Sequence, residues 1–223
     1  MPNRMPNRMP NRAHHNALAL ILPLAAAALA ACGSGVSTDQ ATTPLSTGRT
    51  AAASTPGIVA GPGAQSVYAV QRQPDPGTCH YRTNGGDPLP DPACTPGALN
   101  PQVTQATIGS TICRSGWTST VRPPSSITGA EKRGSAAAYS YTGSFSTGEY
   151  DHLIPLELGG DPNDPANLWI EPNDRPGATS TFNSKDTLES VLRRLVCSGT
   201  ITLATAQSAI ATDWVTASRT YAG

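Results

Sequence analysis

The sequence predicts a small α+β domain cross-linked by disulfides, and three observations support this fold class. Apolar residues recur at helical spacing through residues 181–198 and again through residues 203–218. Before these segments, from residue 147, the chain is predicted to form a short strand, a loop and a second short strand. The domain also contains four cysteines, an even set that in an exported chain indicates two disulfides.

The two helices at the C-terminal end are the clearest predicted elements. The first, residues 181–198, carries one apolar stripe made of Leu188, Val191, Leu192, Leu195 and Val196. Gly199 follows at the position where glycine commonly ends a helix. The second helix is predicted from about residue 203 to residue 218, with Thr202 as its N-cap.

The earlier part of the domain has weaker patterns. Residues 72–101 are dense in Pro, Gly and Asp, which predicts irregular structure held by a disulfide. Residues 102–112 alternate loosely and predict an extended segment, and residues 117–121 predict a short strand that the following prolines end. The sequence Thr-Gly-Ala-Glu at 128–131 has the form of a capping box, so a short helix is predicted from there to residue 138.

The first 32 residues form a predicted targeting segment. Arginines from a repeated Met-Pro-Asn-Arg unit precede an apolar run, residues 17–31, that is too short for a membrane span of about 20 residues. Leu29-Ala30-Ala31-Cys32 resembles the lipobox of bacterial lipoproteins. This resemblance implies lipidation of Cys32, a membrane anchor, and a domain on the periplasmic or extracellular face. The alternative is an ordinary signal peptide cleaved near Ala31, with Cys32 incidental.

Residues 33–65 consist mostly of Ser, Thr, Ala, Gly and Pro, with almost no large apolar side chain. Such a composition buries too little surface to offset the entropy of ordering the chain, so we expect a flexible tether. The remaining residues, 66–223, have the length of a single domain with a modest core.

The four cysteines of this domain, Cys79, Cys94, Cys113 and Cys197, can pair in three ways. We favour Cys79 with Cys94, which closes a loop rich in Pro and Gly, and Cys113 with Cys197, which ties the early part of the domain to the late helix. A structural zinc site is the rival interpretation. No two cysteines have the Cys-x-x-Cys spacing of a zinc knuckle, so we expect no structural zinc.

The predicted domain is mildly acidic. Four of the chain's basic residues and one acidic residue precede residue 66, which leaves 11 basic against 14 acidic residues in the domain. This balance lacks the electrostatic footprint of tight, non-specific nucleic-acid binding. Weak binding that allows turnover is compatible with it.

The most informative motif is Glu-Tyr-Asp-His-Leu-Ile-Pro-Leu-Glu-Leu-Gly-Gly at residues 149–160, followed by Asn-Leu-Trp at residues 167–169. An Asp-His pair that ends a short strand, a glycine turn, and an Asn that opens the next strand together resemble an HNH endonuclease, also called a ββα-metal or His-Me finger. The resemblance implies a strand–strand–helix finger over residues 147–198, with the last helix as an addition. It also implies metal-dependent hydrolysis of phosphodiester bonds in DNA or RNA.

Phosphodiester hydrolysis needs an activated water and stabilisation of charge on the phosphate, which one histidine and one metal ion can supply. His152 is the candidate general base, because an imidazole can take a proton near neutral pH. Asp151 offers the hard oxygen that Mg²⁺ or Mn²⁺ prefers. Adjacent residues of a regular strand point to opposite faces, so both side chains can serve one site only if the strand ends or bends there.

In the family that the motif resembles, a middle Asn fixes the loop that carries the histidine, and a third residue near the start of the helix ligates the metal. Asn167 matches the first of these places and Asn183 the second, while Asn173 competes with Asn183. Lys185 and Arg175 lie close to the predicted site in sequence and are candidates for binding a substrate phosphate.

A second hypothesis is a non-catalytic surface module that keeps the fold for binding or for envelope structure. The acidic balance of the domain and the absence of a histidine at the third motif position favour it. This hypothesis predicts no metal-dependent cleavage of nucleic acid.

Overall fold

The computed structural model describes residues 57–175 and 177–223. The predicted targeting segment, the candidate lipidation site Cys32 and residues 33–56 of the predicted tether lie outside the described residues. The described part of the chain contains short strands, four α-helices and two 3₁₀ helices. The predicted α+β class is therefore confirmed.

The strands form three two-stranded sheets. β1 (Val59–Ala60) pairs in parallel with β4 (Ala98–Leu99), β2 (Arg82–Asn84) pairs antiparallel with β3 (Asp87–Leu89), and β5 (Glu149–His152) pairs antiparallel with β6 (Leu168–Glu171). The helices are η1 (Ile108–Ser110), α1 (Trp117–Val121), α2 (Ser125–Ala138), η2 (Leu156–Leu158), α3 (Ser184–Cys197) and α4 (Leu203–Tyr221). From residue 149 onward, the predicted order of strand, strand, helix and helix is observed.

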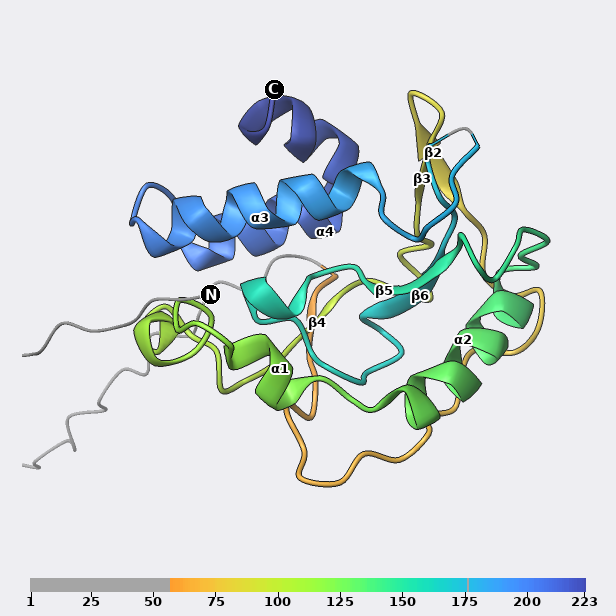
Figure 1. The fold of residues 1–223 in the computed structure, drawn as a ribbon, viewed down its shortest axis with the longest axis horizontal. Helices are drawn as coiled ribbons and strands as arrows, with labels where there is room; N and C mark the ends of the chain where they lie inside the picture. The colour runs from red at the N-terminus through yellow and green to blue at the C-terminus, as the bar shows by residue number, and fades with distance from the viewer. Residues whose placement is uncertain (1–56, 176) are drawn as a thin grey trace, which may run out of the picture. The chain divides into compact units, whose positions relative to one another are not determined.

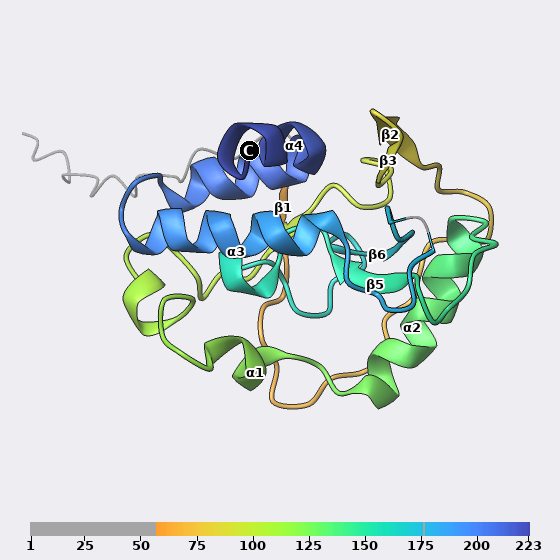
Figure 2. The ribbon, with the colours of Figure 1, turned by 45° about the horizontal axis from the view of Figure 1, so that its top comes forward.

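The β5–β6 hairpin lies between two groups of helices. Figures 1 and 2 show α2 along one side of the hairpin and the packed pair α3 and α4 on the other. One hydrophobic cluster joins α2 to β6 through Ala136, Trp169 and Ile170. A larger cluster joins α3 and α4 to η2 and α1, and includes Leu192 and Trp214. The first cluster thus packs α2 against the hairpin itself, and the second packs α3 and α4 against η2, in the loop that joins the two strands of the hairpin.

The ends of α3 follow from local sequence. Asn183 is its N-cap and forms a capping box with Asp186, in which each side chain accepts a hydrogen bond from the other residue's backbone N–H. At the other end Gly199 has a φ of +77°, and the N–H groups of Gly199 and Thr200 donate to the carbonyls of Val196 and Leu195. The predicted helix is confirmed, although it begins at residue 184 rather than 181.

α4 is also confirmed, with Thr202 as its N-cap. The Thr202 side chain accepts a hydrogen bond from the backbone N–H of Thr205. The helix reaches residue 221, beyond the predicted end, but it is kinked at Asp213, whose φ and ψ are not helical. The Asp213 carboxylate accepts hydrogen bonds from Thr216 N and Asn84 Nδ2, so it acts as a second cap and ties the kink to the β2–β3 hairpin.

The upstream predictions were wrong in two places. Residues 117–121 form α1 and not a strand, since Trp117 and Val121 are both buried and four residues apart, which is one face of a helix. Residues 102–112 form turns and η1 rather than an extended segment. The Thr107 hydroxyl donates to the carbonyl of Gln102 and accepts from the N–H of Thr104, and such local bonds compete with a strand.

Two further predictions differ from the structure. α2 begins at Ser125, because Pro124 accepts the first backbone hydrogen bonds of the helix from Ile127 and Thr128. Glu131 therefore lies inside the helix and caps nothing; its carboxylate accepts from the N–H of Gln71. Residues 82–89, predicted to be irregular, contain the β2–β3 hairpin.

The predicted boundary between tether and domain at residue 65 also lies too late. Val59 N and Gly61 N donate to the carbonyls of Gly97 and Leu99 as β1 pairs with β4. Gly63 N donates to the Asp161 carboxylate at 2.6 Å. Residues 57–65 are thus part of the folded domain, because long-range backbone pairing orders a segment whose composition alone indicates a tether.

The structure has the disulfides Cys79–Cys94 and Cys113–Cys197, which confirms the favoured pairing. Two disulfides fit an extracellular or periplasmic location, where thiols are oxidised. Among the described residues, no helix has the length and apolar character needed to cross a membrane.

We expect the two disulfides to contribute unequally to stability. A cross-link restricts the unfolded chain more when it closes a longer loop, and the two pairs span 84 and 15 residues. Replacing Cys113 and Cys197 by serine should lower the free energy of unfolding by about 4.5 kcal/mol, and replacing Cys79 and Cys94 by about 3 kcal/mol. Guanidinium denaturation of both double variants measures the difference. An equal or reversed order would contradict this account.

Candidate functional site

A pocket of about 270 Å³ lies against the end of β5 and contains the motif residues Asp151 and His152. α1 and the residue after it contribute Thr118 and Arg122, while η2 contributes Glu157. The first turns of α3 contribute three polar side chains, Asp186, Glu189 and Ser190. Side chains from four separate elements therefore converge on the pocket.

Asp151 and His152 line the same pocket although they are adjacent in a strand. His152 is the last residue of β5, and the chain bends at Leu153 before η2 begins at Leu156. The bend relieves the alternation that would place the two side chains on opposite faces of a longer strand. The condition set by the sequence, that the strand must end or bend at this pair, is met.

The His152 imidazole is held in one orientation. Its side chain is buried, and Nε2 donates to the carbonyl oxygen of Pro162 at 3.0 Å. Because a carbonyl only accepts, the proton of the neutral ring lies on Nε2 and the lone pair lies on Nδ1. Burial lowers the pKa of His152 to about 4, so the ring is neutral at neutral pH. The ring is thus in the unprotonated form that a general base requires, with its lone pair on Nδ1, although a pKa of about 4 makes it a weaker base than a free imidazole.

Asn167 fixes the loop that follows His152. Its Nδ2 donates to the carbonyls of Ile154 and Asp161, and its Oδ1 accepts from the N–H of Ile154, each at 3.0 Å. Asn167 is fully buried. Gly160 lies against this amide, and a Cβ there would collide with the Ile154 carbonyl and with Asn167 Nδ2. One side chain therefore closes the loop between the two strands by backbone hydrogen bonds.

Lys185 occupies a different place from the one expected of a substrate-binding residue. Its side chain is fully buried, and Nζ donates to Asp151 Oδ2, to Glu189 Oε1 at 2.6 Å and to the His152 carbonyl at 2.8 Å. An ammonium group has three N–H donors, and all three are used. Lys185 therefore has no N–H donor left to bind a substrate phosphate.

Asn183 and Asn173 are both engaged with the backbone. Asn183 Oδ1, the atom that would ligate a metal ion, accepts from Lys185 N at 2.9 Å and Asp186 N at 3.3 Å as the cap of α3. Asn173 Nδ2 donates to the carbonyls of Ser180 and Phe182. Neither asparagine lines the pocket with Asp151 and His152.

Arg175, the other candidate for phosphate binding, lies outside the pocket. Its guanidinium stacks on the Phe182 ring at 4.5 Å from the ring centre, and Phe182 forms part of the pocket wall. Arg122 reaches the pocket itself and is exposed to solvent. No local pattern in the sequence marks Arg122 as a site residue, because packing of α1 against η2 brings it to the pocket.

Asp186 and Glu189 were also missed as site residues, although a signal for them exists. They are three residues apart on a predicted helix and therefore share a face, directly after the third motif position. Together with Asp151 and Glu157 they give the pocket four carboxylates. These are the hard oxygen ligands that Mg²⁺ and Mn²⁺ prefer.

The carboxylates around Lys185 differ in their affinity for protons. Burial would raise the pKa of Asp151, but the Lys185 ammonium outweighs it and the pKa lies below the usual value. Burial raises the pKa of Glu189 to about 8, and the pKa of Glu171 also lies well above its usual value, chiefly through burial. Asp151 is thus the carboxylate that stays ionised, which is the form that binds a metal ion.

The carboxylates of the pocket are the kind of ligand that Mg²⁺ prefers, but few of them are grouped closely enough to bind one ion together. No group of three or more His, Cys, Asp or Glu side chains among the described residues is arranged to hold a metal ion. Mg²⁺ commonly uses only one or two protein carboxylates and completes its shell with water and substrate phosphates. A site built on Asp151, with Glu189 or Asp186 from α3, fits that pattern.

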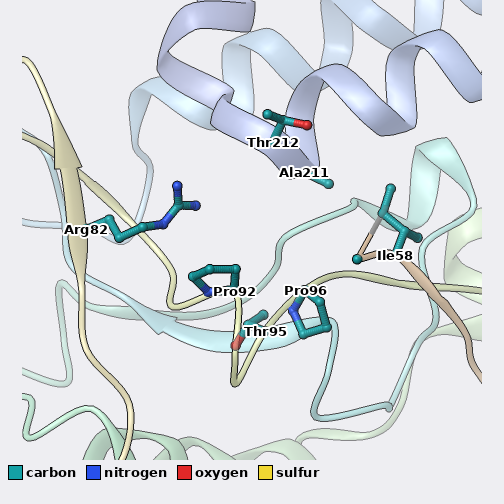
Figure 3. A pocket seen from close by; sticks show the side chains of 8 residues that line it. Ile58, Arg82, Pro92, Thr95, Pro96, Ala211 and Thr212 are labelled. Carbon is teal, nitrogen blue, oxygen red and sulfur yellow. The ribbon is translucent and has the colours of Figure 1, made fainter. Parts of the chain in front are cut away.

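A second pocket, of about 220 Å³, lacks this chemistry. Figure 3 shows Arg82 pointing into it from β2, with Pro92 and Pro96 below and Ala211 of α4 above. The Arg82 Nε donates to the Pro90 carbonyl, and no carboxylate or histidine lines the space. The pocket at Asp151 and His152 is therefore the better candidate for a reactive site.

Comparisons of the chain with protein-family models, with curated proteins and with solved structures found no match.

In the metal-free protein we expect Glu189 to make stability depend on pH. Its pKa in the folded chain, about 8, lies above its ordinary value of 4.5. Its contribution to stability is therefore complete below about pH 4.5 and is lost as the pH rises through about 8. Urea denaturation in the presence of a chelator, between about pH 5 and pH 9, should show a steeper loss in wild type than in Glu189→Gln. One proton accounts for about 1.4 kcal/mol per pH unit at most. Parallel profiles of the two proteins would count against the raised pKa.

Proposed function

We propose that this protein is an exported, metal-dependent endonuclease of the HNH class that hydrolyses phosphodiester bonds in DNA or RNA. The observation that carries the proposal is the neutral, buried His152, fixed by Pro162 in the wall of the pocket that also contains Asp151. The order β5, β6, α3 agrees with a ββα-metal finger. Export and a lipid anchor at Cys32 remain part of the proposal.

His152 acts as the general base in this mechanism. Its Nδ1 accepts a proton from the water that attacks the scissile phosphate, while the Pro162 carbonyl keeps the other ring nitrogen protonated. Asn167 holds the loop from Ile154 to Asp161, so the imidazole and its carbonyl partner keep their relative position. Such positioning reduces the reorganisation needed during the reaction.

Asp151 is the proposed protein ligand of the metal ion. A bound Mg²⁺ or Mn²⁺ stabilises negative charge on the phosphate and on the departing oxygen. Asn183 could join as a ligand only by releasing the two N–H groups that it caps. Glu189 and Asp186 line the pocket, and among the described residues each uses only one carboxylate oxygen, Glu189 Oε1 for Lys185 and Asp186 Oδ2 for the N–H of Asn183.

Arg122 is the proposed contact for the substrate phosphate. It is exposed at the rim of the pocket, whereas Lys185 is buried and Arg175 stacks outside. A guanidinium binds a phosphate with two N–H donors and cannot lose its charge. In an acidic pocket, Arg122 and the metal ion together supply the positive charge that a polyanionic substrate requires.

One observation favours the alternative of a non-catalytic surface module. Asp151, the proposed metal ligand, already has a cation, because Lys185 Nζ donates to its carboxylate. If this pairing excludes a metal ion, Asp151→Ala leaves Mn²⁺ affinity unchanged in calorimetry and no cleavage is detected. A weaker affinity in Asp151→Ala would rule out this alternative.

The first test of the endonuclease is plasmid cleavage by the full chain with Mg²⁺ or Mn²⁺. His152→Ala should lower the cleavage rate by roughly 10²- to 10⁴-fold, since it removes the general base. His80→Ala is the matched control, because His80 is exposed and lies outside the pocket. Cleavage that survives in His152→Ala at the rate of the control would remove His152 from the mechanism.

A second test separates the candidate phosphate contacts. Arg122→Ala should raise KM for a nucleic-acid substrate about tenfold, because a charge-assisted hydrogen bond contributes about 1.4 kcal/mol or more. Arg175→Ala should change KM little, and Arg133→Ala on the exposed side of α2 serves as the control for lost charge. A larger effect from Arg175 than from Arg122 would transfer the contact to Arg175.

A further inference from the structure

The Lys185 ammonium is surrounded by oxygens in the way a metal ion would be. Asp151 Oδ2, Glu189 Oε1 at 2.6 Å and the His152 carbonyl at 2.8 Å accept its three N–H groups. A third carboxylate oxygen, Glu171 Oε2, lies 3.7 Å from Nζ. Carboxylates and a backbone carbonyl are the ligands that hard divalent cations take in proteins.

One of these oxygens is left without a partner. Glu171 is 1% exposed, and its Oε2 has no hydrogen-bond donor among the described residues. An ammonium has only three donors, so it cannot satisfy a fourth oxygen. A divalent ion, which takes six or more oxygens, has no such limit. This cage, made of Asp151, Glu189, Glu171 and the His152 carbonyl, therefore contains one carboxylate oxygen that receives none of the three N–H groups of the ammonium.

Two of the carboxylates belong to both the cage and the pocket. Asp151 and Glu189 each contact Lys185 Nζ, and both line the pocket where a substrate and a metal ion would bind. In hydrolases with two metal ions, the two cations lie about 3.5–4 Å apart. The ammonium is a fixed cation that would share Asp151 and Glu189 with a metal ion bound in the pocket.

We propose that the Lys185 ammonium occupies a position that a divalent metal ion would otherwise take, so that the site accepts one metal ion rather than two. This inference rests on the proposed function, because the remaining ion is the one that Asp151 would hold. Lys185 is then a positioning residue: it fixes Asp151 and Glu189 and supplies one of the two positive charges.

The test counts Mn²⁺ ions bound per chain by calorimetric titration of the full chain with MnCl₂. Lys185→Met keeps an unbranched side chain of similar length without charge, and Lys185→Arg keeps the charge. Lys132→Met is the matched control, since Lys132 is the other lysine of the sequence and its Nζ donates to the Phe145 carbonyl beside α2. Wild type, Lys185→Arg and Lys132→Met should bind one ion, and Lys185→Met should bind one more.

The outcomes separate this inference from the proposed function. An unchanged or smaller number of ions in Lys185→Met overturns the inference. If wild type binds none while Lys185→Met binds one, the ammonium does hold a metal position and the metal-dependent function fails. If Lys185→Met is unfolded without metal, circular dichroism at saturating MnCl₂ decides: refolding supports the inference, and a chain that stays unfolded overturns it.

Discussion

The burial of the Lys185 ammonium between α3 and the β5–β6 hairpin is the interaction on which the rest of the site depends. Removing an ammonium ion from water costs several kcal/mol, and this cost is offset here because Asp151, Glu189 and the His152 carbonyl accept all three N–H groups. Removing one partner of such a pair typically costs about 3–5 kcal/mol. Because the partners come from both α3 and β5, the helix cannot shift along the hairpin without leaving a charge unpaired.

A second constraint fixes the histidine independently of this charge network. Asn167, at the start of β6, binds the backbone on both sides of η2, and the loop it closes presents the Pro162 carbonyl to His152. Asn167 is fully buried, and the hydrogen bonds of its side chain and of the His152 ring are all made to backbone groups. The side chain that would accept a proton is therefore held by contacts separate from those of the α3 carboxylates, of which Glu189 binds Lys185 and Asp186 caps the helix.

The fold could be predicted from the sequence where local chemistry decides it. α3 and α4 were found because a cap, an apolar stripe and a terminating glycine agree, and the disulfides because loop closure favoured one pairing. The helix at 117–121 and the strand at 59–60 were missed because tertiary packing and long-range pairing override weak local patterns. In the site, the motif located Asp151 and His152. It could not show that Lys185 is buried, since lysine side chains are almost never fully buried unless paired.

The ion pairs around Lys185 also bear on whether the domain needs a metal ion in order to fold. Small domains with thin cores often depend on a structural metal ion to fold. Here two disulfides cross-link the chain, and the Lys185 ammonium joins the hairpin to α3. The fold therefore has its own cation and its own covalent links before any metal binds. A metal ion at Asp151 would therefore not be required for folding, although its binding to the folded chain would still add stability by mass action.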